Sequence, residues 1–211
     1  MKASLINGSP KKNNSASASI IKAIQIRMEH KADCTVCNAA SQKQQEILES
    51  FDKCNALVFV FPLYVDSLPS HLLRLLDDIW NKIADYAPQA RIYAVVNNGF
   101  YEGRQNAAAL EVMRNFCACA GLQWGQGLGV GAGGMIFAAP VGHGPLKNLG
   151  RALDLLAENI LEGKTGDDYL FEPNFPKFLY KTFAHLGWIW QARKNGLKIR
   201  QMWDKSKVKH R

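Results

Sequence analysis

A continuous run of six apolar residues, ALVFVF at residues 56–61, constrains the fold more than any other stretch of the chain. Strands with one face in water alternate apolar and polar residues, whereas a strand that is buried on both faces is apolar throughout. A second apolar segment, residues 91–97, has the same character. Helices must cover both faces of such strands, so the sequence predicts a parallel sheet between two helical layers.

Segments of strand and helix character alternate along the first three quarters of the chain. Strands are predicted at residues 2–7, 32–37, 56–61, 91–97 and 122–130, and helices at residues 15–29, 42–53, 70–84, 106–120 and 145–162. Because crossovers between parallel strands are right-handed, this alternation predicts a doubly wound α/β fold. The expected order of the five strands is 2-1-3-4-5, and ligands then bind beyond the carboxyl ends of strands 1, 3 and 4.

The loop after the first strand is rich in small polar residues and leads directly into a helix. The first turn of a helix has backbone N–H groups without partners and a partial positive charge, which suits a phosphate. The side-chain donors of this loop are Ser9, Asn14, Ser15 and Ser17, and Lys11 or Lys12 can add charge. Asn14 or Ser15 would equally serve as a plain helix cap. The loop matches neither the nucleotide P-loop nor the Gly-x-Gly-x-x-Gly pattern, so it indicates a phosphomonoester such as that of FMN.

Two further loops are expected at the same edge of the sheet. PLYVDSLP, residues 62–69, is fixed by two prolines, and its Tyr64 offers a ring or a hydroxyl. NNGFYEG, residues 97–103, contains Gly99, which is free to adopt a positive φ and expose backbone N–H groups. A flat heterocycle held by backbone dipoles is typical of a flavin site. The alternatives are a Tyr64 that only packs and a Glu102 that only stabilises the following helix.

Together these motifs resemble the NADPH-dependent FMN reductase / NAD(P)H-dependent oxidoreductase family, which has the flavodoxin-like fold. The resemblance covers residues 1–160 and rests on LINGSPK with Asn14-Ser15, on PLYVDSLP with Leu76-Asp77, and on NNGFYE. It implies FMN as cofactor and NADPH or NADH as co-substrate, with hydride passing through flavin N5 to a quinone, a flavin or another small electron acceptor. No side-chain acid or base is then required, because the cofactor performs the chemistry.

The resemblance also implies which residues contact the cofactor. The phosphate would face Ser9, Lys11, Asn14, Ser15, Ala16 and Ser17. The ring side would be formed by Pro62, Leu63, Tyr64, Val65, Asp66, Asn97, Asn98, Gly99, Phe100 and Glu102. The family often has Arg where Lys11 stands, and Lys keeps the charge but loses the bidentate fork.

The five cysteines indicate no metal site. Some relatives in the family carry an iron–sulfur cluster on a compact set of four cysteines, and this chain lacks that set, so no cluster is expected. Cys34-x-x-Cys37 leaves a redox or metal role open, although no second pair completes a zinc site. Cys117 and Cys119 lie in an apolar helix and are expected in the core.

The last part of the chain has a different character. Residues 1–162 are predicted to form the FMN-binding domain, and residues 163–211 an aromatic and basic helical extension. Residues 176–194 indicate one helix, interrupted near Gly187, and residues 191–211 contain eight Lys or Arg and one acid. Such a helix packs on its own domain or on a partner subunit, or it lies on a membrane surface as a peripheral contact. The basic tail is otherwise simply solvated.

The remaining expectations concern surroundings and partners. No stretch approaches the ~18 apolar residues of a membrane span, and the N-terminus lacks the pattern of a signal peptide, so a cytoplasmic protein without disulfides is expected. A homodimer is expected from the resemblance, and no nucleic-acid partner. One alternative is a flavodoxin-like electron carrier, although such carriers are usually strongly acidic. The other alternative is a non-enzymatic module, associated with a membrane or a nucleic acid, that has kept the fold but lost the flavin.

Overall fold

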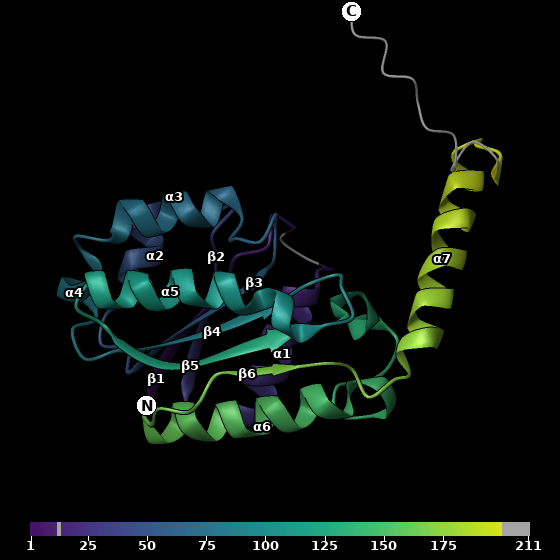
Figure 1. The fold of residues 1–211 in the computed structure, drawn as a ribbon. Helices are drawn as coiled ribbons and strands as arrows, with labels where there is room; N and C mark the ends of the chain where they lie inside the picture. The colour runs from purple at the N-terminus through teal and green to yellow at the C-terminus, as the bar shows by residue number, and fades with distance from the viewer. Residues whose placement is uncertain (12–13, 200–211) are drawn as a thin grey trace, which may run out of the picture. The chain divides into compact units, whose positions relative to one another are not determined.

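The computed structural model describes residues 1–11 and 14–199, which divide into two compact units, Met1–Asn174 and a second unit from Phe175 onward. The first unit is built on one parallel sheet with the order β2-β1-β3-β4-β5-β6 (Figure 1). Its strands are β1 (Lys2–Asn7), β2 (Asp33–Asn38), β3 (Ala56–Pro62), β4 (Arg91–Asn97), β5 (Gln123–Val130) and β6 (Tyr169–Phe171). The predicted doubly wound fold and the order of its first five strands are confirmed.

Helices cover both faces of this sheet, as the apolar strands require. One layer contains α1 (Ala16–Met28) and α6 (Lys147–Glu162), and the other contains α2 (Gln44–Ser50), α3 (Ser70–Ile79), α4 (Ile83–Tyr86) and α5 (Ala107–Cys119). Three short 3₁₀ helices, η1 (Gly103–Asn106), η2 (Gly133–Phe137) and η3 (Gly144–Leu146), lie in the connections.

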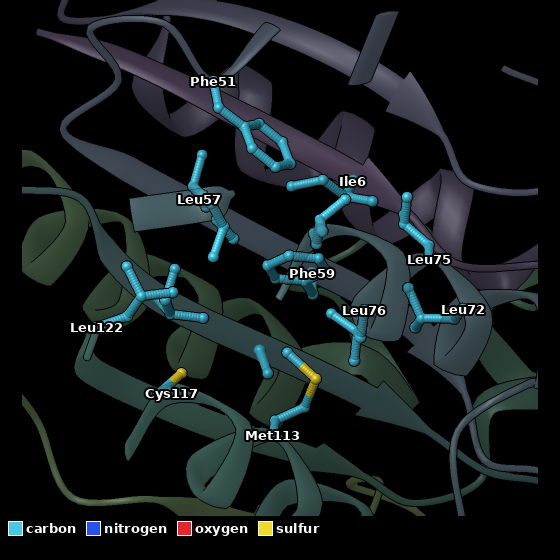
Figure 2. Packing of buried hydrophobic residues seen from close by; sticks show 14 of the residues in the cluster. Ile6, Phe51, Leu57, Phe59, Leu72, Leu75, Leu76, Met113, Cys117 and Leu122 are labelled. Carbon is cyan, nitrogen blue, oxygen red and sulfur yellow. The ribbon is translucent and has the colours of Figure 1, made fainter. Parts of the chain in front are cut away.

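Strand β3 supplies both halves of the core. Leu57, Phe59 and Phe61 point to the layer of α2, α3 and α5, where they pack with Leu72, Met113 and other buried side chains (Figure 2). Val58 and Val60 point to the layer of α1 and α6. Because successive side chains of a strand alternate between faces, a strand that is apolar throughout fills two cores at once.

The sheet has one strand more than the five predicted. Tyr169 lies beside Leu128 and Phe171 beside Val130, in a register parallel to β5. Strand β6 was not predicted, because it is only three residues long and follows a polar, glycine-rich stretch. Residues 163–174 thus lie in the first unit, whereas the sequence placed them in the extension.

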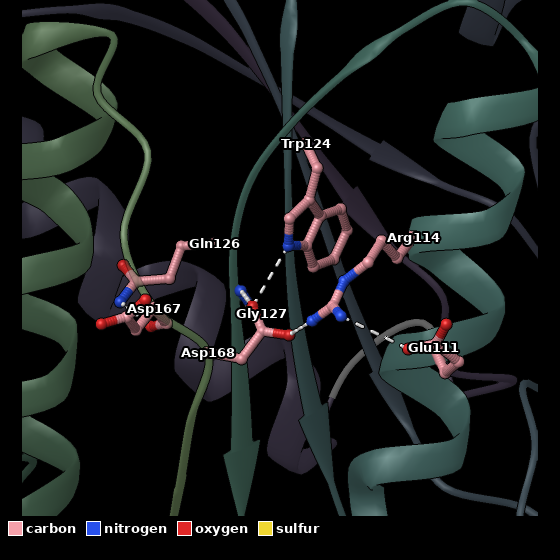
Figure 3. Close-up of polar contacts among 7 residues, drawn as sticks. All are labelled: Glu111, Arg114, Trp124, Gln126, Gly127, Asp167 and Asp168. Carbon is pink, nitrogen blue, oxygen red and sulfur yellow. Dashed lines mark hydrogen bonds and ion pairs between the residues drawn. The ribbon is translucent and has the colours of Figure 1, made fainter.

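One carboxylate fixes this sixth strand. Asp168 Oδ1 accepts hydrogen bonds from the backbone N–H of Gly127 at 2.7 Å and from the indole Nε1 of Trp124 at 3.1 Å (Figure 3). Its other oxygen pairs with Arg114 of α5, which also contacts Glu111. A side chain just before β6 thus sets the strand against β5 with hydrogen bonds that the sequence pattern does not encode.

Several predicted boundaries are corrected. The helix expected over residues 70–84 is two helices, α3 and α4, and the one expected over 106–120 opens with the 3₁₀ turn η1. The helix expected over 42–53 is shorter, since α2 spans Gln44–Ser50. Cys117 is buried as predicted, but Cys119 is exposed, because residues two apart on a helix point to nearly opposite sides.

The two cysteines of the Cys34-x-x-Cys37 pattern do not form a common site. Cys37 packs in the core beneath α2, whereas Cys34 packs against the core on the opposite face of the sheet. Cys34 and Cys37 are three residues apart, and residues separated by an odd number on a strand have side chains on opposite faces of the sheet. Burial raises the pKa of the Cys34 thiol above its usual value and that of Cys117 to about 12, so both are protonated at neutral pH.

The second unit consists of one long helix, α7 (Lys177–Lys194), with the residues around it. The helix continues through Gly187, so the predicted interruption there is wrong. It ends at Asn195, and Gly196 follows with φ of 77°, a left-handed conformation that commonly terminates a helix. None of the side chains of α7 is buried. Across residues 1–11 and 14–199, no helix combines the length and apolarity that crossing a membrane requires.

Candidate functional site

The connection from β1 to α1 presents a helix N-terminus at the carboxyl edge of the sheet. Ser15 caps α1, and its Oγ accepts a hydrogen bond from Ala18 N at 3.1 Å. Among the described residues, the backbone N–H groups of Ala16 and Ser17 have no acceptor, and the first turn of α1 contains no acidic residue. Unpaired N–H groups with partial positive charge form a ready site for an anion.

Three serines of this connection are buried, and each hydroxyl oxygen already accepts one hydrogen bond. Ser9 Oγ accepts from Lys11 N at 3.2 Å, and Ser17 Oγ accepts from Asn97 Nδ2 at 3.1 Å. A hydroxyl that accepts one hydrogen bond still has its own hydrogen to donate. Lys11 is exposed, so its ammonium is free to approach a ligand, and Asn14 takes a left-handed φ of 56° that turns the chain into the helix.

Gly8 fixes the start of this connection by close packing. Its N–H donates to Val60 O at 2.9 Å, and a Cβ at this position would lie 2.7 Å from Leu72 Cδ2 and 2.8 Å from Phe61 Cβ. Its φ is not positive, so glycine is needed here for space rather than for a left-handed backbone conformation.

His71 is a positioning residue that the sequence analysis missed. Its Nε2 lies 3.0 Å from Gly8 O, and because a carbonyl oxygen only accepts, the ring nitrogen donates. His71 stands at the start of α3, sixty-three residues from Gly8, and no local pattern marks it. The connection after β1 is therefore held from β3 on one side and from α3 on the other.

The loop after β3 is a two-residue hairpin rather than a simple rigid connection. Tyr64 N donates to Ser67 O at 2.9 Å, and Ser67 N donates to Tyr64 O at 3.0 Å. Val65 and Asp66 between them have φ of 49° and 58°. Such turns favour Asn-Gly, and a β-branched residue with positive φ is unusual, at a cost of roughly 1–2 kcal/mol. Unfavourable backbone conformations of this kind concentrate at ligand sites.

This hairpin exposes apolar side chains at the site. Val65 is 97% exposed and Tyr64 is 48% exposed, whereas Leu63 is partly buried and packs against the core. Pro62 ends β3, and Leu63 N donates to Asn97 O at 2.8 Å, which ties this loop to the end of β4. The predicted alternative of a Tyr64 that only packs does not describe a side chain that is half exposed.

The loop after β4 joins the other two. Asn97 is buried, and its Nδ2 donates to Ser17 Oγ and, at 3.0 Å, to Phe61 O, so this amide links α1 and β3 rather than facing outward. Asn98 Nδ2 donates to Glu102 O at 3.1 Å, while Asn98 Oδ1 is buried with no hydrogen-bond partner in the part of the chain that the structure describes. A buried acceptor without a donor is costly, so this loop contains an unmet polar group.

The outer part of the same loop is open. Phe100 is 55% exposed, and a Cβ at Gly99 would meet nothing within 4 Å. The expected positive φ at Gly99 is not found. Instead, the left-handed position is Ala132 in the loop after β5, whose N–H donates to Phe100 O, while Gly133 N donates to Asn98 O at 2.6 Å. The glycine-rich stretch after β5 thus supports the loop that carries Asn98 to Phe100.

The structure brings the three predicted loops together at the carboxyl edges of β1, β3 and β4, where the strand order reverses between β1 and β3. Switch points of this kind are where open α/β sheets bind ligands. The N-terminus of α1 fits a phosphate, and the neighbouring half-exposed aromatic side chains fit a flat ring. The residues present are therefore compatible with FMN.

Comparison with known proteins bears on the fold. No family model matches the chain, and no curated protein matches it. Solved structures do match. An apo NADH:FMN oxidoreductase aligns with a TM-score of 0.57 at 12% identity, over 78% of this chain and 90% of its own. An FMN-dependent NADH-azoreductase from Bacillus anthracis, in complex with FMN, aligns at 0.54 and 15% identity, over 76% and 99%.

A flavodoxin from Streptococcus pneumoniae matches as well, with a TM-score of 0.55 at 13% identity, over 77% of this chain and 99% of its own. The fold is flavodoxin-like. The oxidoreductase, the azoreductase and the flavodoxin share it, and the three alignments extend over comparable lengths.

Proposed function

We propose that the chain is an FMN-dependent oxidoreductase that takes electrons from NADPH or NADH and delivers them to a quinone, a flavin or another small acceptor. The observation that carries the proposal is the set of hydrogen-bond donors between β1 and the first turn of α1, which suits a phosphate. Two N–H groups, of Ala16 and Ser17, have no acceptor among the residues that the structure describes, and they accompany buried serine hydroxyls at the switch point of the sheet. The solved structures supply context, since one protein of this fold is named an NADH:FMN oxidoreductase and another an FMN-dependent NADH-azoreductase.

Each end of the site has a defined task. The N-terminus of α1, with Ser9, Ser15 and Ser17, would hold the phosphate, and Lys11 would add charge from solvent. Tyr64 and Phe100 would flank the ring, where their half-exposed side chains exclude water once a ligand covers them. FMN, when bound, supplies the transfer of electrons between the nicotinamide and the acceptor. The protein needs no side-chain acid or base for that step, so orientation and electrostatics are its contribution.

A flavodoxin-like electron carrier is the second candidate, because flavodoxins align as well as reductases do. The net charge of the first unit distinguishes the carrier from the enzyme. Residues 1–174 contain 16 Lys or Arg and 17 Asp or Glu, a net charge of −1. Carriers of this fold are usually strongly acidic, since they meet basic partners. A nearly neutral domain favours the enzyme that reacts with small molecules.

Titration of the full-length protein with FMN and with riboflavin tests the site. Riboflavin has the same ring without the phosphate, so the wild-type protein is expected to bind FMN far more tightly. Lys11→Glu reverses an exposed charge beside the predicted phosphate and is expected to weaken FMN binding about three- to tenfold while leaving riboflavin unchanged. Lys31→Glu, an equally exposed change beyond the other end of α1, is the control and is expected to have no effect.

Turnover then separates the two candidates. An oxidoreductase of this kind is expected to oxidise NADPH or NADH in the presence of FMN and menadione, whereas a carrier binds FMN without such turnover. A protein that binds neither flavin, or that binds both with equal affinity, would contradict the site assigned to the three loops.

A further inference from the structure

The second unit has a one-sided charge. From Phe175 to Ile199 the chain contains no Asp or Glu, and it contains five Lys or Arg: Lys177, Lys181, Arg193, Lys194 and Lys198. With the residues that follow, residues 175–211 have a net charge of +9, whereas residues 1–174 have −1. The basic character of the protein therefore resides in this unit. A segment of this charge attracts anionic surfaces.

An apolar stripe runs along the same helix. Leu179, Phe183, Leu186 and Trp190 follow one another at intervals of four, three and four residues, which places them on one face of α7. Phe183 is 61% exposed and Trp190 is 66% exposed, and Leu186 is exposed as well. An exposed stripe of large apolar side chains on a helix indicates a surface that binds a membrane or another molecule.

Cations lie beside and behind this stripe. Lys194 Nζ lies 5.3 Å from the centroid of the Trp190 ring, at one end of the helix. The helical spacing places Lys177, Lys181 and Trp188 on the side of α7 opposite the stripe. Long basic side chains of this kind keep the charge in water while their stems follow an apolar surface. Exposed aromatic residues and cations without acids are part of the composition of an interfacial helix.

We propose that α7 lies on the surface of an anionic phospholipid membrane, with the stripe of Leu179, Phe183, Leu186 and Trp190 in the interface and with Arg193 and Lys194, which flank the stripe, against the headgroups. The helix does not qualify as a membrane span, so it lies on the bilayer rather than across it. A second copy of α7 is a poorer occupant, because pairing would bring two segments of charge +9 together. Single-stranded nucleic acid is also poorer, since Leu179 and Leu186 provide no ring on which a base stacks.

This proposal is independent of FMN, and its test uses the full-length protein with vesicles. Sedimentation with phosphatidylcholine vesicles is compared with sedimentation with vesicles that contain about 30% phosphatidylglycerol. The protein is expected to bind the anionic vesicles and not the neutral ones, and added salt is expected to weaken the binding. Arg193→Glu and Lys194→Glu reverse charges beside the stripe and are each expected to reduce the affinity for anionic vesicles about fivefold. Lys177→Glu and Lys181→Glu, on the opposite side of the helix, are expected to reduce it less.

The two tryptophans of α7 provide a matched pair. Trp188 and Trp190 are 68% and 66% exposed, but only Trp190 lies on the stripe. Trp190→Ala is expected to lower the affinity for anionic vesicles about tenfold, and Trp188→Ala is expected to change it little. Circular dichroism of both variants checks that the helix is kept.

Several outcomes would overturn the proposal. One is equal binding to neutral and anionic vesicles, and another is no binding to either. If Trp188→Ala and Trp190→Ala lower the affinity for anionic vesicles equally, the stripe is not the face of α7 that contacts the membrane. A dimer in solution that Trp190→Ala dissociates, without vesicle binding, would assign the stripe to a second copy. Binding to a single-stranded oligonucleotide in place of vesicles would assign it to nucleic acid.

Discussion

Residues 1–174 and α7 both contain large apolar side chains, but they place them differently. In the first unit, Phe59 and its neighbours lie between the sheet and a helical layer with no exposed surface (Figure 2). In α7, no side chain is buried, and Phe183 exposes 61% of its surface. Charge differs in the same way, since residues 1–174 have a net charge of −1 and residues 175–211 have +9. A strand between two helical layers buries its apolar side chains on both faces within the same unit. A single helix has no such cover, so its apolar side chains are exposed unless another surface packs against them.

Two phenylalanine variants provide the largest test of this comparison. Phe59→Ala removes a fully buried ring and is expected to lower the free energy of unfolding by about 3–5 kcal/mol. Phe183→Ala removes the same side chain from α7 and is expected to change that free energy by less than about 0.5 kcal/mol. Urea unfolding monitored by circular dichroism measures both. A loss from Phe183→Ala as large as that from Phe59→Ala would show that the stripe of α7 is part of a core.

Close packing in the first unit extends to the site itself, and two glycines sharpen this point. Gly8→Ala places a methyl group against Leu72 and Phe61, and it is expected to cost about 1–3 kcal/mol of stability and to weaken FMN binding. Gly99→Ala is the matched change in open space and is expected to leave stability within about 0.5 kcal/mol. Thermal unfolding and FMN titration of both variants measure the effects. Equal stability of the two variants would show that the connection after β1 adapts to the added methyl group.

A buried hydroxyl gives the smallest expected effect and a test by pH. Tyr93 lies in the core, and its OH lies 3.0 Å from Asn159 O and 2.9 Å from Lys164 O. Tyr93→Phe leaves these carbonyl oxygens without that donor, so a loss of about 1 kcal/mol is expected at neutral pH. Burial raises the pKa of Tyr93 from 10.0 to about 12, so the native protein keeps this proton at a pH where the unfolded chain loses it.

The sign of the pH effect follows from this difference. Stability of the wild-type protein falls as the pH rises from 10.0 towards about 12, because the unfolded state gains by releasing the Tyr93 proton. Tyr93→Phe lacks this contribution, so its deficit relative to wild type is expected to shrink over that range. Urea midpoints of the two proteins, measured in parallel from neutral to alkaline pH, provide the comparison. A deficit that stays constant with pH would contradict a buried, protonated Tyr93.

Much of the first unit was predictable because its signals are local. The apolar run at residues 56–61 requires cover on both faces, and the alternation of strand and helix segments leads to the doubly wound order. The three site loops followed from that order, since the carboxyl ends of parallel strands meet at one edge. The α7 helix was also predicted, although its continuity through Gly187 was not.

Features that depend on distant partners were not predictable. β6 has three residues, and its place depends on the hydrogen bonds that Asp168 receives from β5. The link between His71 and Gly8 joins residues far apart in sequence. The positive φ falls at Val65 rather than at Gly99, because the hairpin after β3 closes on its own hydrogen bonds.

The sequence by itself determined the layers, the strand order and the edge at which the loops gather, because apolar periodicity acts through neighbours in the chain. Only the tertiary structure decided how those loops are held. The Asn97 amide points inward to Ser17, and Asn98 Oδ1 has no donor within residues 1–11 and 14–199. Gly8 is anchored from β3 and α3. Hydrogen bonds and close contacts of this kind form between residues that only the fold brings together, so no local pattern specifies them.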